Sequence, residues 1–410
     1  MKSDLDRLMA ERDIDAMVVE GPDGLDSANP DYNYFVGGRH LPGLVLKRRG
    51  EPAMLVHGVM ERQQAAETGL VLIPRDRWNI REIRNAFPNA LDAQVEYRRR
   101  MLTDLGMTGR VAFYGSVRAG PHYALLSTLA RRMPELEIVA EYEASIIDTA
   151  RATKDAAEIA EMRRVGRKTA EVVAEVVALI RAGRARDGLL FDTAGVPITI
   201  GRVKELIQRE LVARNLEGAN TIFAQGADAG LPHARGNDAE QLRLGTPIVL
   251  DIFPREPGGY YHDMTRTFAI GYAPPELQQV YDHVMGAFTK VVGELEMGAP
   301  TRVYQQMVCD YFEALGHPTI GSTYPLEEGF IHSLGHGLGL DVHEDPRMST
   351  LNDQGDILAP GTVVTIEPGL YYPSRGIGVR VEDTYYCTPD GRFESLTDFP
   401  KDLVIPVEAA

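Results

Sequence analysis

The chain is poor in cysteine and in long apolar runs. Its 410 residues contain only two cysteines, Cys309 and Cys387, which excludes a disulfide framework and indicates a reducing compartment. The longest apolar stretch, 170–180, is interrupted by two glutamates and is too short to span a bilayer. Residues 1–13 are charged and lack the apolar core of a signal peptide. These absences predict a soluble, cytoplasmic protein without a membrane partner.

Positive charge is also scarce. The 43 Lys and Arg residues are outnumbered by 59 Asp and Glu residues, which gives a net charge of −16. This excess argues against a general nucleic-acid binder, which needs a basic face. The 44% hydrophobic and 25% charged content is ordinary for a globular protein. A chain of this length is longer than a single hydrophobic core usually supports, so we expect two domains.

Residues 1–148 alternate between helical and strand-like patterns, which predicts an α/β N-terminal domain. A turn at Gly37–Gly38 separates the segment at 34–36 from a hairpin around Arg49-Gly50. A helix is expected at 123–133. Extended segments are predicted at 16–19, 34–36, 43–46, 53–56, 111–114 and 138–140.

Residues 149–410 form a second predicted domain of the α+β class. Asp155 followed by Glu158 is a capping-box pattern that opens a helix extending to Ile180. Further helices are expected at 200–213 and 275–297. The remainder is rich in strand patterns, at 221–224, 247–253, 263–270, 363–366 and 379–386.

Two aspartates lie in strands that a hairpin would join. Asp251 sits in an apolar strand, and Asp263 follows twelve residues later. The Pro257-Gly258-Gly259 turn between them can bring both onto one sheet face. For either residue alone, an Asp at a strand end, satisfied by backbone amides or by Arg266, is the structural alternative.

A second predicted hairpin carries two glutamates. Strand alternation puts Thr365 and Glu367 on one face, and Arg380 and Glu382 on one face of the partner strand. A cross-strand ion pair is the structural alternative for Arg380. Such a pair would still leave several of the carboxylates uncompensated.

Between these hairpins, His332, His336 and His343 fall within twelve residues, next to alternating glycines that allow close backbone approach. A phosphate-binding glycine loop is disfavoured, because no Lys or Walker pattern accompanies it. Buried core packing is plausible for one of the three histidines but not for all. His233 lies in a turn-rich loop before the first Asp strand and, taken alone, is typical of a surface residue.

Five of these residues form a set of metal ligands, namely Asp251, Asp263, His336, Glu367 and Glu382. Four carboxylates gathered without a cation would repel one another and raise their own pKa values. Oxygen-rich ligands with one imidazole suit two divalent ions better than one. The set therefore predicts a metal-dependent hydrolase.

The segments that carry these residues read PHARGN, VLDIF, GYYHDMTRTF, HSLGHGLGLDVHEDPR, TIEPGLYY and GIGVRVEDT. In this order they resemble the creatinase/aminopeptidase family of metallopeptidases, family M24, which has the pita-bread fold. Residues 1–148 are similar to the creatinase-like N-terminal domain of the Xaa-Pro peptidase branch. Methionine aminopeptidases generally lack such a domain, which favours the Xaa-Pro branch.

The resemblance implies a role for each matching residue. Asp251 would bind one metal, Asp263 and Glu382 would bridge both, and His336 and Glu367 would complete the set of ligands of the second metal. Glu367 would also transfer the nucleophile's proton.

The same resemblance implies the residues that handle substrate. His343 would stabilise the oxyanion, while His233 and His332 would line the substrate pocket and assist catalysis. Arg380 would support the bridging glutamate, and Arg347 would meet a dipeptide carboxylate. One departure is that the Asp251–Asp263 interval is a residue longer than usual, and we expect the turn at 255–259 to hold the extra residue.

The implied activity is hydrolysis of Xaa-Pro dipeptides by a cytoplasmic homodimer that binds small peptides. The cofactor would be two Mn²⁺ ions, with Co²⁺ or Zn²⁺ as alternatives. Three other functions remain open: an Xaa-Pro aminopeptidase acting on longer peptides, a C–N hydrolase or lyase acting on a small molecule, and a binding protein of the same fold. The last is disfavoured because all five ligands are present.

Overall fold

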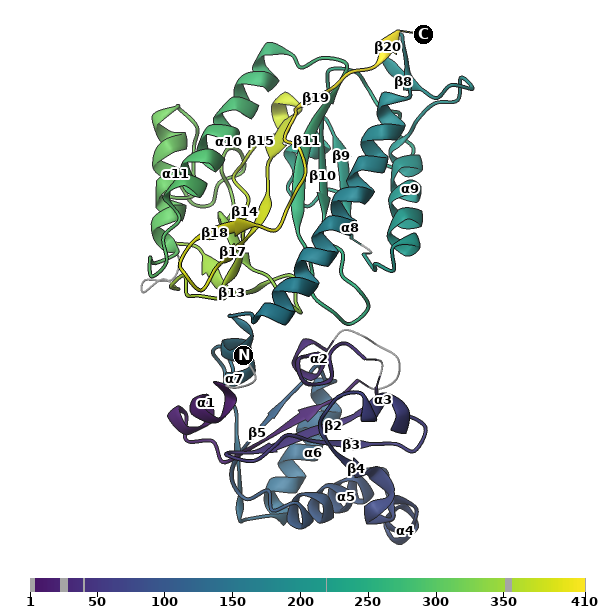
Figure 1. Cartoon of the computed structure of the whole chain (residues 1–410), viewed down its shortest axis with the longest axis vertical. Coiled ribbons are helices and arrows are strands. Elements are labelled where there is room, and N and C mark those ends of the chain that lie inside the picture. The colour runs from purple at the N-terminus through teal and green to yellow at the C-terminus, as the bar shows by residue number, and fades with distance from the viewer. Residues whose placement is uncertain (1–3, 23–28, 40, 219, 351–355, 410) are drawn as a thin grey trace. The chain divides into compact units, whose positions relative to one another are not determined.

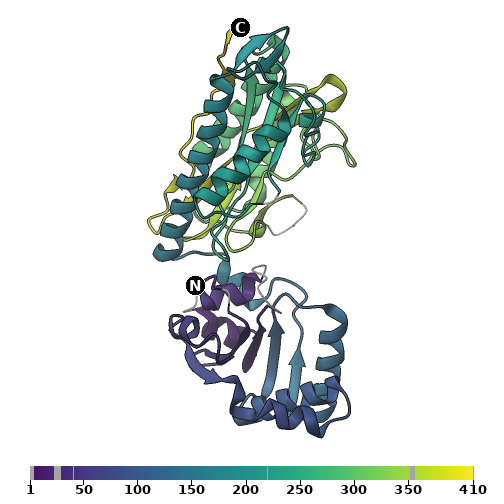
Figure 2. The same cartoon turned by 90° about the vertical axis from the view of Figure 1, so that its right-hand side faces the viewer.

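The computed structural model describes residues 4–22, 29–39, 41–218, 220–350 and 356–409. Contacts divide the chain into two compact units, which are described separately. Unit 1 comprises Met1–Arg151 with Pro257–Gly259, and unit 2 comprises Ala152–Glu256 with Tyr260–Ala410. The two units are seen from two directions in Figures 1 and 2. The division falls after residue 151, and the sequence patterns put it after residue 148.

Unit 1 is built on a mixed sheet with the strand order β4-β3-β2-β1-β5-β6. β1 pairs antiparallel with β2 and parallel with β5. The strands are β1 (Ala16–Glu20), β2 (Gly43–Arg48), β3 (Met54–His57), β4 (Val71–Pro74), β5 (Gly109–Tyr114) and β6 (Leu136–Val139). The helices are α1 (Leu5–Glu11), α2 (Pro30–Val36), α3 (Arg62–Ala66), α4 (Ile80–Ala86), α5 (Ala90–Asp104), α6 (Ala119–Arg132) and α7 (Ile146–Arg151).

The extended segment predicted at 34–36 is wrong, because these residues end helix α2. Asn29 caps this helix by accepting a hydrogen bond from the Tyr32 amide at 3.2 Å. Pro30 takes the first helical position, and Gly37 ends the helix with a φ of 67°. The aromatic residues of the helix are buried, and a short apolar run of this kind fits a buried strand as well as a buried helix.

Unit 2 contains four helices among its described residues: α8 (Ala156–Arg181), α9 (Ile200–Ala213), α10 (Pro275–Glu294) and α11 (Arg302–Ala314). The capping box predicted at Asp155 and Glu158 is present and begins α8. No helix among the described residues combines the length and the hydropathy needed to cross a membrane.

The larger sheets of unit 2 lie between two pairs of helices (Figure 1). α8 and α9 contribute to one apolar core, together with β9, β10 and β11, and α10 and α11 contribute to the other. The sheets have the orders β19-β11-β10-β9, β13-β12-β14-β17-β18, β15-β16 and β20-β7-β8. Their strands are β7 (Arg184–Arg186), β8 (Leu189–Phe191), β9 (Ile222–Gln225), β10 (Pro247–Ile252), β11 (Met264–Ile270), β12 (Gly335–Gly337), β13 (Glu344–Met348), β14 (Val363–Ile366), β15 (Gly369–Tyr372), β16 (Ile377–Arg380), β17 (Asp383–Cys387), β18 (Phe393–Ser395), β19 (Val404–Ile405) and β20 (Glu408–Ala409).

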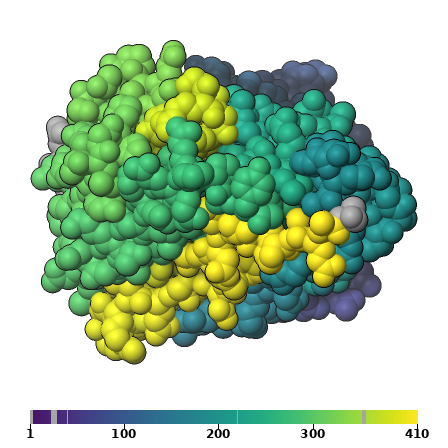
Figure 3. Space-filling model, turned by 90° about the horizontal axis from the view of Figure 1, so that it is seen from above, coloured from purple at the N-terminus to yellow at the C-terminus, as the bar shows by residue number. Residues whose placement is uncertain are grey.

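The C-terminal segment adds a strand to each of two sheets of unit 2. β19 adds to the edge of β11, and β20 pairs with β7. Figure 3 shows this segment in yellow, exposed across one face of the molecule.

The single strand predicted at 379–386 is two strands, because the hairpin is interrupted. β14 pairs with β17 and β15 pairs with β16 in one continuous register, which puts Glu367 opposite Glu382 at the interruption. At this interruption the backbone amides of both glutamates form hydrogen bonds with other segments of the chain. The Glu367 amide donates to the Leu334 carbonyl at 2.8 Å, and the Glu382 amide donates to the Thr265 carbonyl at 3.1 Å. The two glutamates therefore lie where the sheets diverge.

The hairpin of β10 and β11 keeps its register up to the connecting loop. Asp251 pairs with Thr265, and the later bridge between Arg255 and Tyr261 continues the same register. The long Asp251–Asp263 interval is therefore accommodated within 256–260. Because the register is unbroken, alternation leaves Asp263 on the same face as Asp251.

Candidate metal centre

Five polar side chains from separate strands converge in unit 2. Asp251 lies in β10, Asp263 directly before β11, His336 in β12, Glu367 directly after β14 and Glu382 directly before β17. Ligand atoms of Asp263, His336 and Glu382 all lie within 4.8 Å of one another. His336 Nε2 is 3.5 Å from Glu367 Oε1 and 3.9 Å from Asp263 Oδ2. Besides burial, the charges of Glu382, Asp251 and Glu367 all contribute to raising the pKa of Asp263.

His336 presents an unprotonated ring nitrogen to the carboxylates. Its Nδ1 lies 3.0 Å from the Gly337 carbonyl oxygen. A carbonyl only accepts, so the proton is assigned to Nδ1 and the lone pair to Nε2. Burial, reinforced by the charge of His343, lowers the pKa of His336 to about 3. The ring is therefore neutral, which is the form that binds metals.

The carboxylates carry negative charge that the protein does not balance. Burial, then the charges of Glu382 and Asp251, holds the pKa of Asp263 well above its usual value. Burial and Glu382 raise the pKa of Glu367, and burial and Asp251 raise that of Glu382 to about 8. Among the described residues, the buried oxygens Asp251 Oδ1 and Asp263 Oδ1 have no hydrogen-bond partner. Unpartnered carboxylate oxygens around a neutral imidazole fit divalent cations.

Arg380 is the guanidinium within this cluster. Its Nη2 donates to Asp251 Oδ2 at 2.5 Å, and its Nε donates to Thr265 Oγ1 at 3.0 Å. The resemblance implies that Arg380 supports the bridging Glu382, and Thr265 Oγ1, which accepts from Arg380, donates to Glu382 Oε2 at 2.8 Å. Arg266, the alternative partner considered for the aspartates, binds Asp383.

A directional chain of hydrogen bonds leads away from Arg380. Arg380 Nη1 donates to the Tyr371 hydroxyl at 2.8 Å, and this hydroxyl lies 2.9 Å from His332 Nε2. His332 Nδ1 is 2.7 Å from the Ser333 carbonyl, so Nδ1 carries the proton and Tyr371 donates to Nε2. Burial lowers the pKa of His332 to about 4. The sequence analysis did not single out Tyr371, which lies in β15, four residues after Glu367.

Two of the remaining predicted residues, His343 and Arg347, lie beside His336. The rings of His343 and His336 are 4.3 Å apart between centroids. Arg347 stands opposite His336 in the ladder of β12 and β13, and its side chain is exposed. His233 is exposed and lies in a turn, near enough for its charge to lower the pKa values of His332 and His343.

Comparison with known proteins identifies the family. The model of metallopeptidase family M24 matches residues 160–389, which is more than half of the chain. The chain belongs to this family. Members act on peptides and use divalent metal ions, which agrees with the donor set described above.

Curated relatives include two proteins of Bacillus subtilis strain 168. An uncharacterized peptidase, YqhT, is 33% identical over 61% of this chain and 67% of its own length. A putative dipeptidase, YkvY, is 34% identical over 56% of this chain and 61% of its own length. The chain thus matches about two thirds of these relatives or less. A Xaa-Pro dipeptidase of Pyrococcus horikoshii is 27% identical over 97% of this chain and 96% of its own length.

Solved structures share the whole architecture. An X-Pro aminopeptidase from Thermotoga maritima has a TM-score of 0.74 at 23% identity, and a Xaa-Pro dipeptidase from Bacillus anthracis has 0.76 at 22% identity. Each comparison covers 99% of both chains. The predicted fold, an α/β N-terminal domain followed by an α+β pita-bread domain, is confirmed.

Proposed function

We propose that this protein hydrolyses the bond before proline in Xaa-Pro dipeptides, using two divalent ions. The observation that carries the proposal is the buried cluster of four carboxylates around the free Nε2 of His336. The name and full-length match of the Pyrococcus horikoshii Xaa-Pro dipeptidase also support it.

The donor set supports a specific assignment of ligands. Asp251 would hold one ion, Asp263 and Glu382 both ions, and His336 and Glu367 the second. When bound, divalent ions lower the pKa of water and polarise the scissile carbonyl. Four carboxylates and one imidazole favour Mn²⁺ or Co²⁺, with Zn²⁺ as the alternative.

The protein's own side chains would handle protons and orient the substrate. Glu367 takes a proton from the attacking water and delivers it to the proline nitrogen as the peptide bond breaks. His343 donates a hydrogen bond to the developing oxyanion, a contribution of about 3 kcal/mol in comparable sites. His233 and His332 line the pocket, where the bond from Tyr371 fixes the orientation of the His332 ring.

Arg347 favours the dipeptidase over the aminopeptidase. Its exposed guanidinium shares a sheet face with His336, from which it can bind the free carboxylate of a bound dipeptide. We also propose that the protein is a cytoplasmic homodimer. The two free, buried cysteines support the reducing compartment.

The test is turnover of Ala-Pro and Ala-Pro-Ala by protein stripped with a chelator and reloaded with Mn²⁺. Metal-dependent cleavage of the dipeptide alone would support the proposal, and cleavage of the tripeptide would make the protein an aminopeptidase. If the metal-loaded protein cleaves neither peptide, peptidase activity would be refuted and a reaction on a small molecule would be favoured.

The role of Arg347 is tested separately. Arg347→Ala should raise KM for Ala-Pro about tenfold, the worth of one charge-assisted contact, and affect Ala-Pro-Ala less. Arg392→Ala, at an exposed arginine paired with Asp390, is the matched control. Equal losses on both substrates would remove the reason to prefer the dipeptidase.

A further inference from the structure

Unit 2 contains a buried ion pair whose residues are not among the ligands. Lys154 Nζ lies 2.9 Å from Glu344 Oε2, and the two side chains are 1% and 6% exposed. Burying an ion pair removes the hydration of both charges, so such a pair contributes little net stability compared with apolar packing. A buried ion pair can instead serve to fix one arrangement of the segments it joins. The segments that Lys154 and Glu344 join are therefore relevant.

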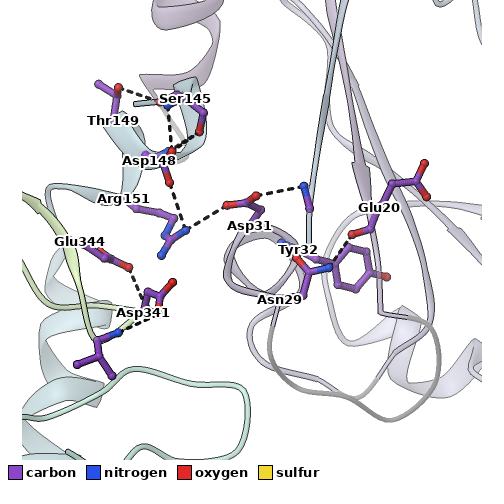
Figure 4. Close-up of polar contacts among 12 residues, drawn as sticks. Glu20, Asn29, Asp31, Tyr32, Ser145, Asp148, Thr149, Arg151, Asp341 and Glu344 are labelled. Atoms are coloured by element: carbon purple, nitrogen blue, oxygen red, sulfur yellow. Dashed lines mark hydrogen bonds and ion pairs between the residues drawn. The ribbon is translucent and has the colours of Figure 1, made fainter. Parts of the chain in front are cut away.

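Glu344 organises the segment that carries His343. Its second oxygen, Oε1, accepts a hydrogen bond from the Asp341 amide at 3.0 Å (Figure 4). A Cβ at Gly339 would lie only 2.3 Å from Glu344 Oε2, so the backbone at this position approaches the carboxylate closely. Leu338 is fully buried in a small apolar cluster. The segment from His336 to His343 is thus held by the burial of Leu338 and by the contacts of Glu344.

Lys154 is itself tied to the strand that leads to Glu367. Its amide donates to the Gly361 carbonyl at 2.7 Å. Its neighbour Thr153 forms a bridge with Thr362, directly before β14. Because Glu367 follows β14, the ion pair links the backbone before Glu367 to the segment that ends in His343.

We propose that Lys154 and Glu344 are positioning residues that set the place of the His343 ring relative to Glu367. Neither residue belongs to the ligand set, and both act through the backbone between His336 and His343. The inference rests on the proposed function in one respect: His343 must contribute to catalysis for its position to matter.

The test is a kinetic cycle. Lys154→Met should lower kcat for Ala-Pro roughly tenfold to a hundredfold, as misplacing a catalytic group by about 1 Å does. KM should change less than about twofold, and the bound metal should stay unchanged. In a His343→Ala background, Lys154→Met should lower kcat less than about twofold, because the group it positions is gone. Equal losses in both backgrounds, or no loss in either, would overturn the proposal.

Lys168→Met is the matched control. Lys168 lies on α8, a few turns after Lys154 in the chain, and pairs with Glu256 at 2.5 Å. This variant should keep the wild-type kcat. Lys154→Arg keeps the charge and replaces Lys154→Met if that variant does not fold. It should also lower kcat more than Lys168→Met, since a guanidinium does not fit a buried ammonium site, and wild-type kcat in Lys154→Arg would count against the proposal.

Amide hydrogen exchange separates this inference from the proposed function. In Lys154→Met, residues 337–344 should exchange faster than in Lys168→Met, without substrate present. If metal-loaded wild type cleaves no peptide while this segment is loosened, the proposed function fails and the positioning role stands. If wild type is active and exchange in the segment is unchanged, the inference fails and the function stands.

Discussion

Glu382 and Asp383 are adjacent in the sequence but belong to two buried clusters of opposite character. Glu382 joins Asp251, Asp263 and Glu367, with Arg380 as the cation in contact with the cluster. Asp383 binds Arg266 at 2.8 Å on one oxygen and Lys401 on the other. Since successive residues of an extended chain point in opposite directions, one short segment separates the two clusters.

The charged groups of the second cluster, around Asp383, are paired with one another and hydrogen-bonded to the backbone. Beyond Asp383, the guanidinium of Arg266 donates to the carbonyls of Thr265, Glu382, Phe399 and Pro400, at 2.8 to 3.0 Å. Near Asp383 the protein supplies more positive than negative charge, whereas near Glu382 it supplies an excess of carboxylates. Burial alone therefore does not mark a functional site. The mark is buried charge that the chain leaves without a counter-charge.

The largest effect is expected when the uncompensated cluster loses a ligand. Glu382→Ala or Asp263→Ala should abolish metal binding and lower turnover of Ala-Pro on the order of 10³-fold. Metal content by mass spectrometry and kcat measured on the same sample would show both losses. A fully metallated, active Glu382→Ala protein would refute the bridging role and remove the difference between the two clusters.

A large loss of stability is expected when the compensated cluster loses its cation. Arg266→Met leaves Asp383 with Lys401 alone and removes the hydrogen bonds that Arg266 donates to four carbonyls, so the free energy of unfolding should fall by about 3–5 kcal/mol. Urea denaturation of the metal-free protein measures this change. A loss below about 1 kcal/mol would mean that Arg266 is no more important than a surface arginine.

A pH effect should distinguish the clusters without removing a charge from either. Because Asp263, Glu367 and Glu382 have raised pKa values in the folded protein, the folded state binds more protons than the unfolded state above about pH 4. For Glu382 this window extends to about pH 8. The melting temperature of chelated protein should therefore fall as the pH rises through this range.

Adding Mn²⁺ and replacing Glu382 test the same charge imbalance. Divalent ions replace the bound protons, so the increase in melting temperature on adding Mn²⁺ should grow with pH. Glu382→Gln should flatten the pH dependence of the chelated protein, because one titrating carboxylate is lost. A chelated wild type that gains stability toward pH 8 would contradict the charge imbalance.

The smallest effect is expected at an exposed ion pair. Arg163 and Glu394 lie 2.5 Å apart, with both side chains 38% exposed. Arg163→Met should change the free energy of unfolding by about 0–1 kcal/mol and leave turnover unchanged. A larger change by urea denaturation would show that the contrast depends on something other than burial.

Local patterns predicted the helices whose ends are marked in the sequence. The capping box at Asp155 and Glu158 located the start of α8, and the amphipathic period of 200–213 matched α9. α11 was not predicted, although Tyr304, Val308 and Phe312 form its buried stripe. Its N-cap residue makes no side-chain capping bond, so the usual start signal is absent.

The site was predictable as a set of residues but not as an arrangement. Strand alternation grouped Glu367 with Thr365 and Glu382 with Arg380, and both pairs lie close together in the structure. It did not indicate that the hairpin breaks at the two glutamates, because the break depends on bonds to Leu334 and Thr265 from other strands. The partners of Arg380 likewise depend on how separate sheets meet.

The backbone around Glu382 has one further consequence. Its carbonyl is held by Arg266 and its amide by Thr265, so its position is set by the polypeptide and does not require an ion. A site built in this way can release one metal and accept another without refolding. The identity of the ion at such a site would then depend on metal availability as well as on the ligand set.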